Sequence, residues 1–215
     1  MDTIRIALTK GRLEQKSVEM FEAAGFDCSQ LRDKGRRLLL DVGGLPAKAV
    51  LAKAADVVTY VEYGACDIGI VGKDTIIEHG GSFYEVMELG FGKCRFVLAA
   101  KEGNDIYRGF RRLKIATKYP AVARNFFDKK GMDIEIIKIE GSVELAPLLD
   151  LADGIVDITE TGATLKENGL VIVDEVCNIS ARMIVNTASM KMKSNIILPF
   201  IEKLKEVCEN NAQNS

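Results

Sequence analysis

Residues 155–165 read Ile-Val-Asp-Ile-Thr-Glu-Thr-Gly-Ala-Thr-Leu, and this stretch decides the fold. Its first part is short, apolar and β-branched, which is typical of a strand covered on both faces in a parallel sheet. Asp157 interrupts the apolar run near the carboxyl end of the predicted strand, which is where open α/β sheets bind ligands. A carboxylate there can accept hydrogen bonds from sugar hydroxyls. The stretch therefore predicts a ligand-binding strand end in an α/β protein.

Thr161, Gly162 and Thr164 follow the strand and predict a phosphate-binding turn. Glycine permits a positive φ or a close backbone approach, and N–H groups at a helix start can converge with hydroxyls on a phosphate. We expect this helix over residues 163–168, with Gly169 ending it. A strand, a turn and a capped helix without any ligand would use the same residue types. The turn alone leaves both interpretations open.

Composition narrows the classes of protein. The chain has 215 residues, of which 47% are hydrophobic and 28% charged, as in an ordinary soluble globular protein. Lys plus Arg number 29 against 31 Asp plus Glu, so a general role in binding nucleic acid or membrane surfaces has little support. The five scattered cysteines favour a reducing compartment over disulfides or zinc. Because we find neither a signal-peptide pattern nor a long apolar run, we expect a cytoplasmic protein.

Strand and helix patterns alternate along the chain, which predicts parallel sheets with right-handed crossovers. We expect strands at residues 4–9, 38–42, 67–71, 83–89, 94–100, 113–117, 134–139, 170–176 and 182–185, and helices at 13–24, 46–55, 120–130, 143–149 and 193–209. The pattern restarts near residue 92 and returns near residue 179. The predicted fold class is α/β, with two α/β lobes around a cleft: residues 1–91 with 179–215, and residues 92–178.

Cations occur at three further places. Lys10-Gly11-Arg12 follows the first predicted strand, where two cations and free amides can meet an anion. Residues 32–37 contain four cations and one acid, and arginine's planar donor fork suits phosphate oxygens. Lys53 has Asp56 three residues later. Taken alone, each segment is more often only solvated surface charge.

The sequence gives little support for a dinucleotide cofactor or for a histidine acting as a catalytic base. The chain has no G-x-G-x-x-G segment, so a dinucleotide cofactor is not expected. His79 is the only histidine and stands in a predicted helix-end turn, Glu78-His79-Gly80-Gly81, without a nucleophile motif beside it. We expect it to be a surface residue.

Five segments in the same order resemble the ATP phosphoribosyltransferases, which catalyse the first step of histidine biosynthesis, across almost the whole chain. They are Lys10-Gly11-Arg12-Leu13; residues 60–74, with Tyr60-Val61-Glu62-Tyr63-Gly64 and Gly72-Lys73-Asp74; residues 116–124; Gly141-Ser142-Val143-Glu144-Leu145-Ala146-Pro147; and residues 157–165. The resemblance implies a fold of the type II periplasmic-binding-protein kind. It also implies a reaction that joins N1 of ATP's adenine to C1 of 5-phosphoribosyl 1-pyrophosphate and releases pyrophosphate, with magnesium carried by the substrates.

The resemblance also implies which residues form the site. Arg36 and Lys53 are expected to neutralise the leaving pyrophosphate. The lobe formed by residues 1–91 and 179–215 is expected to hold ATP. Asp157 is expected to contact ribose hydroxyls or magnesium-linked water. The other expected substrate contacts are Lys10, Gly11, Arg12, Ser142, Glu144, Thr159, Glu160, Thr161, Gly162, Ala163 and Thr164. No metal-ligand residues are expected.

The length resembles that of the family's short form, which works with a separate regulatory subunit related to histidyl-tRNA synthetase. A homodimer of the catalytic chain is also implied. The chain departs from the family pattern at Lys53, Val58 and Asp150. Lysine at position 53 keeps the charge of the usual arginine and loses its bidentate fork.

Two alternatives remain at this point. One is a non-catalytic module that binds phosphorylated sugars on the same two-lobe scaffold, since fold does not imply function. The other is a phosphoribosyltransferase acting on another base, which usually carries adjacent acids before the loop. In this chain Asp157 is followed by Ile158, so the pair of adjacent acids is missing and this second alternative is the less favoured one.

Overall fold

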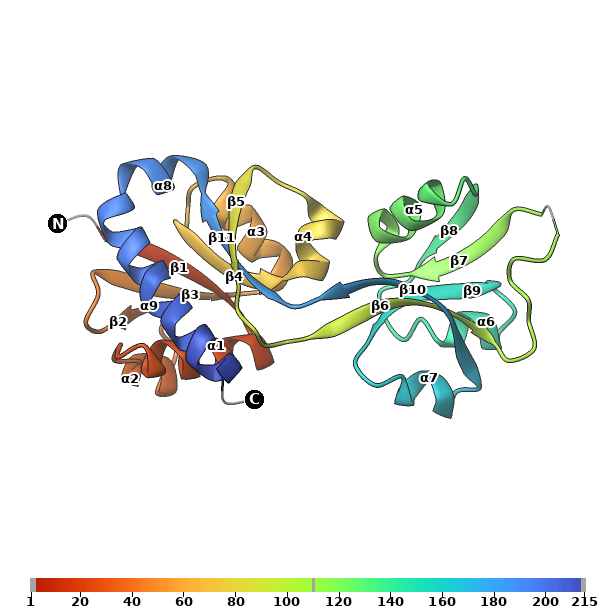
Figure 1. Cartoon of the computed structure of the whole chain (residues 1–215), viewed down its shortest axis with the longest axis horizontal. Helices are drawn as coiled ribbons and strands as arrows, with labels where there is room; N and C mark the ends of the chain where they lie inside the picture. The colour runs from red at the N-terminus through yellow and green to blue at the C-terminus, as the bar shows by residue number, and fades with distance from the viewer. Residues whose placement is uncertain (1–2, 110, 214–215) are drawn as a thin grey trace. The chain divides into compact units, whose positions relative to one another are not determined.

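The computed structural model describes residues 3–109 and 111–213 (Figure 1). The described chain divides into two compact units, residues 1–92 with 180–215 (unit 1) and residues 93–179 (unit 2). The ends of the predicted first lobe, residues 1–2 and 214–215, lie outside the described residues. No helix in the described ranges is both long and apolar enough to span a membrane.

Unit 1 contains a six-stranded sheet in the order β2-β3-β1-β4-β11-β5. Its elements are β1 (Ile4–Thr9), α1 (Arg12–Ala23), α2 (Ser29–Arg32), β2 (Leu39–Val42), β3 (Ala47–Ala52), α3 (Ala54–Glu62), β4 (Ile68–Gly72), α4 (Lys73–His79), β5 (Phe83–Glu88), β11 (Ala181–Asn186), α8 (Thr187–Met192) and α9 (Ser194–Gln213).

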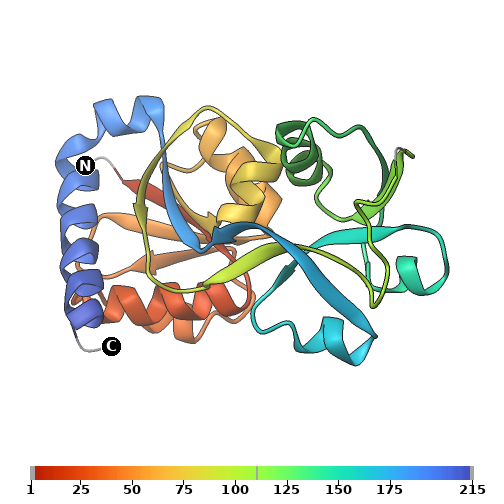
Figure 2. The same cartoon turned by 45° about the vertical axis from the view of Figure 1, so that its right-hand side comes forward.

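Alternation along β1 separates the two faces of this sheet. Ile6 and Leu8 point into the larger core with Phe21 of α1 and Phe200 of α9, whereas Ala7 joins a second core under α3. The rings of Phe21 and Phe200 lie edge to face with centroids 5.3 Å apart. Figure 2 shows α1 and α9 on one side of the unit 1 sheet. Helices therefore cover both faces.

Unit 2 contains a five-stranded sheet in the order β10-β6-β9-β7-β8. Its elements are β6 (Cys94–Lys101), β7 (Leu113–Thr117), α5 (Pro120–Lys129), β8 (Ile134–Lys138), α6 (Leu145–Leu148), β9 (Gly154–Thr159), α7 (Ala163–Glu167) and β10 (Leu170–Ile179). In Figure 1, α5 covers one face of this sheet, and α6 and α7 lie on the other. The core on the second face joins Val97, Ile155, Val143 and Leu165.

The expectation of parallel sheets is wrong in part. Only β3-β1-β4 and β8-β7-β9 pair in parallel. The remaining pairs, β2-β3, β4-β11, β11-β5, β10-β6 and β6-β9, are antiparallel. The chain passes from one unit to the other through β5 to β6 and returns through β10 to β11. These long connecting strands add antiparallel members to each parallel core.

The helix expected at residues 46–55 is also wrong. Residues 47–52 form β3, which pairs with β1 over six positions and with β2 over four. Pairing on both sides outweighs the helix propensity of its alanines. Small side chains also suit a central strand that lies beneath helices. The helix starts later, at Ala54, and Lys53 occupies its N-cap position.

We predict that Phe200→Ala destabilises the protein by about 3–5 kcal/mol, because Phe200 is 1% exposed and contacts the rings of both Phe21 and Phe26. Denaturant unfolding followed by circular dichroism measures this change. Leu198→Ala, two residues away and 47% exposed, is the control. A loss below about 1 kcal/mol for Phe200→Ala would contradict the packing described.

Candidate active site

The carboxyl ends of β9, β7 and β8 meet at one edge of the unit 2 sheet, because these three strands are parallel. Thr117, the last residue of β7, is fully buried. Its hydroxyl donates to the Val156 carbonyl at 2.6 Å and accepts the Tyr119 N–H at 2.8 Å. One side chain therefore ties the end of β7 to the middle of β9 and fixes the turn after β7.

Asp157 lies in β9 at this edge and is only partly exposed. Burial raises the pKa of its carboxyl from 3.8 to about 6, against a hydrogen bond from the Ile158 N–H that lowers it. Among the nearby charges, Glu144 raises this pKa and Lys118 lowers it. The fold thus brings Asp157, Glu144 and Lys118 together. The sequence analysis did not assign Lys118 to the site, although Lys118 lies in the segment 116–124 and directly follows the predicted strand 113–117.

The predicted turn and helix after β9 are confirmed. Gly162 has φ +82°, in the left-handed region, and α7 begins at the next residue. The Gly162 N–H donates to Thr159 Oγ1 at 2.8 Å, and the Ala163 N–H donates to Thr161 Oγ1 at 3.3 Å. Each hydroxyl that accepts an N–H still has its own proton to donate. Thr161, Ala163 and Thr164 are exposed.

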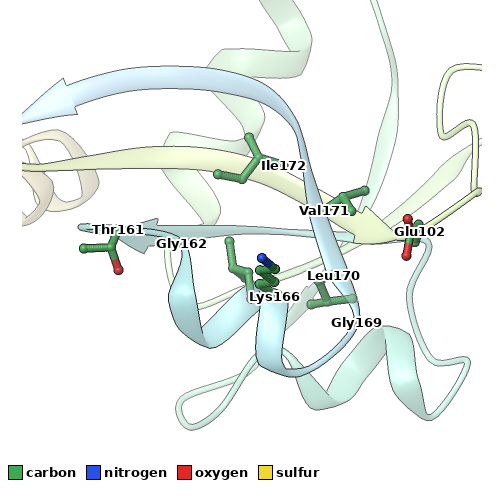
Figure 3. A pocket seen from close by; sticks show the side chains of 9 residues that line it. Glu102, Thr161, Gly162, Lys166, Gly169, Leu170, Val171 and Ile172 are labelled. Atoms are coloured by element: carbon green, nitrogen blue, oxygen red, sulfur yellow. The ribbon is translucent and has the colours of Figure 1, made fainter.

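A cavity of about 350 Å³ lies beside this turn, between α7 and β10 (Figure 3). Thr161 and Gly162 stand at one end of it and Glu102 at the other. Its walls are mainly apolar, with Leu165, Leu170, Val171 and Ile172, and Lys166 also lines it. A mainly apolar lining suits a phosphate less well than the exposed hydroxyls of the turn do.

The other predicted residues of unit 2 lie on the segments around this edge. Ser142 is exposed, and its carbonyl accepts the Leu145 N–H at 3.4 Å at the start of α6. Glu144 is half-buried at the N-cap position of α6. Glu160 is exposed, between the end of β9 and the turn. No ligand contact of these three residues follows from geometry alone.

Parallel pairing also forms a carboxyl edge in unit 1. Thr9 of β1 is opposite Ala52 of β3, and the Lys10 N–H donates to the Ala52 carbonyl at 2.9 Å. Lys10 and Lys53 therefore leave adjacent strand ends, and both side chains are exposed. The Thr9 hydroxyl donates to the Ile70 carbonyl of β4 at 2.9 Å, which fixes the third strand of the edge.

The turn between β1 and α1 requires glycine. Gly11 has φ +95° and is the N-cap of α1, and its N–H donates to Glu14 Oε2 at 3.4 Å. Arg12 is the first residue of α1 and is exposed. Two predicted cations, Lys10 and Arg12, thus flank a turn of fixed shape.

Arg36 lies on an exposed loop between α2 and β2. Its neighbour Arg37 folds back, with its guanidinium donating to the carbonyls of Asp33 at 2.5 Å and Lys34 at 3.3 Å. The loop is therefore closed by its own arginine, and Arg36 remains at its exposed part. His79 ends α4 and is exposed, so the prediction that it is a surface residue is confirmed.

Comparison with known proteins identifies the family. The sequence model described as ATP phosphoribosyltransferase (HisG) matches residues 53–206. ATP phosphoribosyltransferase of Clostridium acetobutylicum is 61% identical over 207 residues, which cover 96% of each chain. That of Clostridium novyi is 57% identical, covering 98% of this chain and 100% of the relative. The chain belongs to the ATP phosphoribosyltransferase family.

Solved structures agree on the fold. A chain of the ATP phosphoribosyl transferase (HisG:HisZ) complex from Thermotoga maritima superposes with a TM-score of 0.83 at 37% identity, covering 97% of this chain and 100% of that one. The aliphatic sulphonate binding protein SsuA from Escherichia coli superposes with a TM-score of 0.61 at 10% identity, covering 100% of this chain and 75% of that one. The second likeness concerns the fold alone, and it confirms the type II periplasmic-binding-protein kind. Membership of the family sets aside the non-catalytic alternative.

We predict that Asp157→Asn stabilises the fold at neutral pH. With the folded pKa near 6 and an ordinary value of 3.8, the folded state binds the proton more tightly than the unfolded state. Stability therefore falls as pH rises from about 4 to about 6 and then stays level, a loss on the order of 2 kcal/mol. Asparagine cannot ionise, so the variant does not lose this stability as the pH rises.

Melting temperatures of Asp157→Asn and the wild type at pH 5 and pH 7.5 test this expectation. The advantage of the variant should be larger at pH 7.5. Asp133→Asn, which changes an exposed acid of the same unit, controls for the loss of one charge. An advantage of equal size at both pH values would show that Asp157 does not titrate as described.

Proposed function

We propose that the chain transfers the 5-phosphoribosyl group of 5-phosphoribosyl 1-pyrophosphate to N1 of ATP, releasing pyrophosphate, as the first step of histidine biosynthesis. The observation that carries the site assignment is the turn after β9. The half-buried Asp157 and the hydroxyl of Thr159 lie at the end of β9, and the hydroxyl of Thr161 and the left-handed Gly162 follow directly. This set of groups matches a sugar phosphate, with hydroxyl donors for the phosphate and a carboxylate for the ribose.

In this proposal unit 2 binds the phosphoribosyl group. Thr161, Gly162, Ala163 and Thr164 hold the 5-phosphate, and Asp157 accepts hydrogen bonds from ribose hydroxyls. Thr159 shapes the turn through its bond from the Gly162 N–H, so its contribution is mainly to the position of the loop. Near neutral pH the carboxyl of Asp157 is mostly ionised, the form that accepts two hydroxyl donors.

Unit 1 supplies positive charge in this proposal. Breaking the bond from C1 to pyrophosphate builds oxocarbenium character on the ribose and negative charge on the leaving group. Arg36 and Lys53 counter the charge on pyrophosphate, and Lys10 and Arg12 face a polyphosphate. Adenine N1 attacks with its own lone pair, so no proton needs to be removed first. Because no base is needed, this chemistry is compatible with His79 being a surface residue that is not among the proposed site residues.

Magnesium enters the proposed reaction as part of the polyphosphate substrates. Within residues 3–109 and 111–213, no cluster of three or more His, Cys, Asp or Glu side chains is arranged to hold a metal ion. A metal that arrives with its phosphates needs few protein ligands, since magnesium keeps several waters and binds substrate phosphates. As a separate point, we propose that the protein is cytoplasmic.

A regulatory partner is the second part of the proposal. The superposed Thermotoga maritima chain comes from a HisG:HisZ complex, and its whole length is covered by this chain. We therefore propose that this chain, as a homodimer, assembles with a HisZ-like subunit related to histidyl-tRNA synthetase. Activation and histidine feedback would then come from that subunit.

The direct test measures formation of phosphoribosyl-ATP from ATP and 5-phosphoribosyl 1-pyrophosphate with magnesium, with pyrophosphatase present to pull the reaction forward. The chain is assayed alone and together with a HisZ-like subunit. We expect turnover that is lost in an Asp157→Ala, Thr161→Ala double variant. Absence of both product and phosphoribosyl pyrophosphate binding in the wild type would refute the proposed function.

We predict that Arg36→Ala lowers the single-turnover rate by about 10²-fold, because a cation that meets the leaving group acts mainly in the transition state. Rapid quench of a single turnover measures this rate. Arg112→Ala, which removes an exposed, ion-paired arginine of unit 2, serves as the control. An unchanged rate in Arg36→Ala would remove this residue from the leaving-group site.

A further inference from the structure

Two acids are buried within the described part of the chain, Glu14 and Asp67. Asp67 has a structural explanation: its carboxylate accepts bonds from the Arg5 N–H at 2.7 Å and the Ser189 hydroxyl at 2.7 Å, and it pairs with Lys193 at 2.9 Å. These contacts attach α8 and the start of α9 to the amino end of β4. Glu14 lies at the other end of the sheet, in the first turn of α1, and needs a separate explanation.

The Glu14 carboxylate bridges two segments that are remote in sequence. Oε2 accepts the N–H of Gly11 at 3.4 Å, and Oε1 forms an ion pair with Nζ of Lys34. The side chain of Glu14 is 6% exposed, whereas that of Lys34 is 39% exposed. A buried carboxylate at the edge of unit 1 therefore holds a lysine from a surface loop.

Charge, more than packing, maintains this link. A cavity of about 190 Å³ lies beneath the loop, lined by residues that include Glu14, Val18, Leu31 and Lys34. The side chain of Lys34 is 39% exposed, so packing covers it only in part. A buried carboxylate, in contrast, is strongly disfavoured unless a cation or N–H group accompanies it. Arg32 pairs with Glu22 of α1 and Leu31 packs in the core, which attach α2 to α1. Beyond α2, the ion pair of Lys34 with Glu14 links the loop itself to the first turn of α1.

The two bridged segments both carry proposed polyphosphate contacts. Gly11 lies between Lys10 and Arg12, and Lys34 is two residues before Arg36. The Arg37 N–H donates to the Lys34 carbonyl at 3.2 Å, so Arg36 lies inside a turn whose first residue is anchored on Glu14. Fixing Lys34 thus restricts the position of Arg36 relative to the turn at Gly11.

We propose that Glu14 is a positioning residue, which presets the Lys10–Arg12 turn and the Arg36 loop as two halves of one pyrophosphate-binding group. The inference rests on the proposed function and deepens it. Before the anion binds, the cations of the Lys10–Arg12 turn and Arg36 repel each other. The negative charge of the buried Glu14 carboxylate, which lies in the first turn of α1, offsets part of that repulsion. Groups fixed in advance need less reorganisation when charge develops on the leaving group.

The variants Glu14→Gln, Lys34→Gln and their double combination test the link. Glutamine keeps the size of Glu14 and an oxygen for the Gly11 N–H, and it removes the ion pair. Glu19→Gln is the matched control, because it makes the same substitution on the outer face of α1 and also breaks an ion pair, with Lys16 at 2.8 Å. Melting temperatures show that each variant folds. Should Glu14→Gln fail to fold, Lys34→Gln at the more exposed partner carries the test.

We expect the dissociation constant of magnesium pyrophosphate, measured by calorimetry, and the KM for 5-phosphoribosyl 1-pyrophosphate each to rise about 10-fold in both single variants. The double variant should lose no more than either single one, because all three break the same link. The KM for ATP and the properties of Glu19→Gln should stay within about twofold of the wild type. Unchanged or tighter pyrophosphate binding in both single variants would overturn the proposal.

Hydrogen exchange separates this inference from the proposed function, because it needs no substrate. The amides of Gly11 and Arg37 are both hydrogen-bonded. Each single variant should speed their exchange several-fold, and Glu19→Gln should not. Unchanged exchange would refute the link between the two segments. A wild type that forms no product would count against the proposed function, while the exchange experiment would still decide on the link.

Discussion

Both candidate edges depend on one repeated contact, in which a threonine hydroxyl at the end of one parallel strand bonds a carbonyl within the neighbouring strand. Thr9 ends β1 and bonds the Ile70 carbonyl of β4, and Thr117 ends β7 and bonds the Val156 carbonyl of β9. In each unit this threonine lies on the central strand of the parallel triplet. The turns that follow parallel strands all lie at the same edge of the sheet. Functional side chains from distant parts of the sequence therefore gather there, and the hydroxyl holds their strands in register.

The buried Asp67 and the partly exposed Asp157 differ in how well the fold compensates their charge. Asp67 has a backbone N–H, a hydroxyl and an ammonium group as partners, so its charge is well compensated. Asp157 is held by one backbone N–H and faces the like charge of Glu144, with Lys118 as the opposing cation. Its raised pKa measures an uncompensated burial, which a residue selected only for stability would avoid. In the proposed function, the ribose hydroxyls of the substrate supply the missing partners.

The sequence predicts elements well where a local pattern and the tertiary environment agree. The strands at 4–9 and 113–117 have the predicted bounds, and the turn at Gly162 follows from glycine and threonine chemistry that needs no distant partner. The strand at 47–52 was predicted as a helix because its pairing partner, β1, is about forty residues away and leaves no local signal. Lys118 was missed for a different reason. The rule that selected Lys10, a cation directly after a strand, applies equally to it.

The division of charge between the units explains how a chain with a net charge of −2 can serve two polyanionic substrates. At the carboxyl edge of unit 1, Lys10 and Lys53 leave adjacent strand ends, and the acid beneath, Glu14, is buried and already paired. The corresponding edge of unit 2 carries acids together with hydroxyls, a chemistry suited to a sugar and its single phosphate. In the proposed function, leaving-group charge and ribose hydroxyls therefore meet different surfaces of the same chain. Local arrangement, and not overall charge, determines which anion each surface can stabilise.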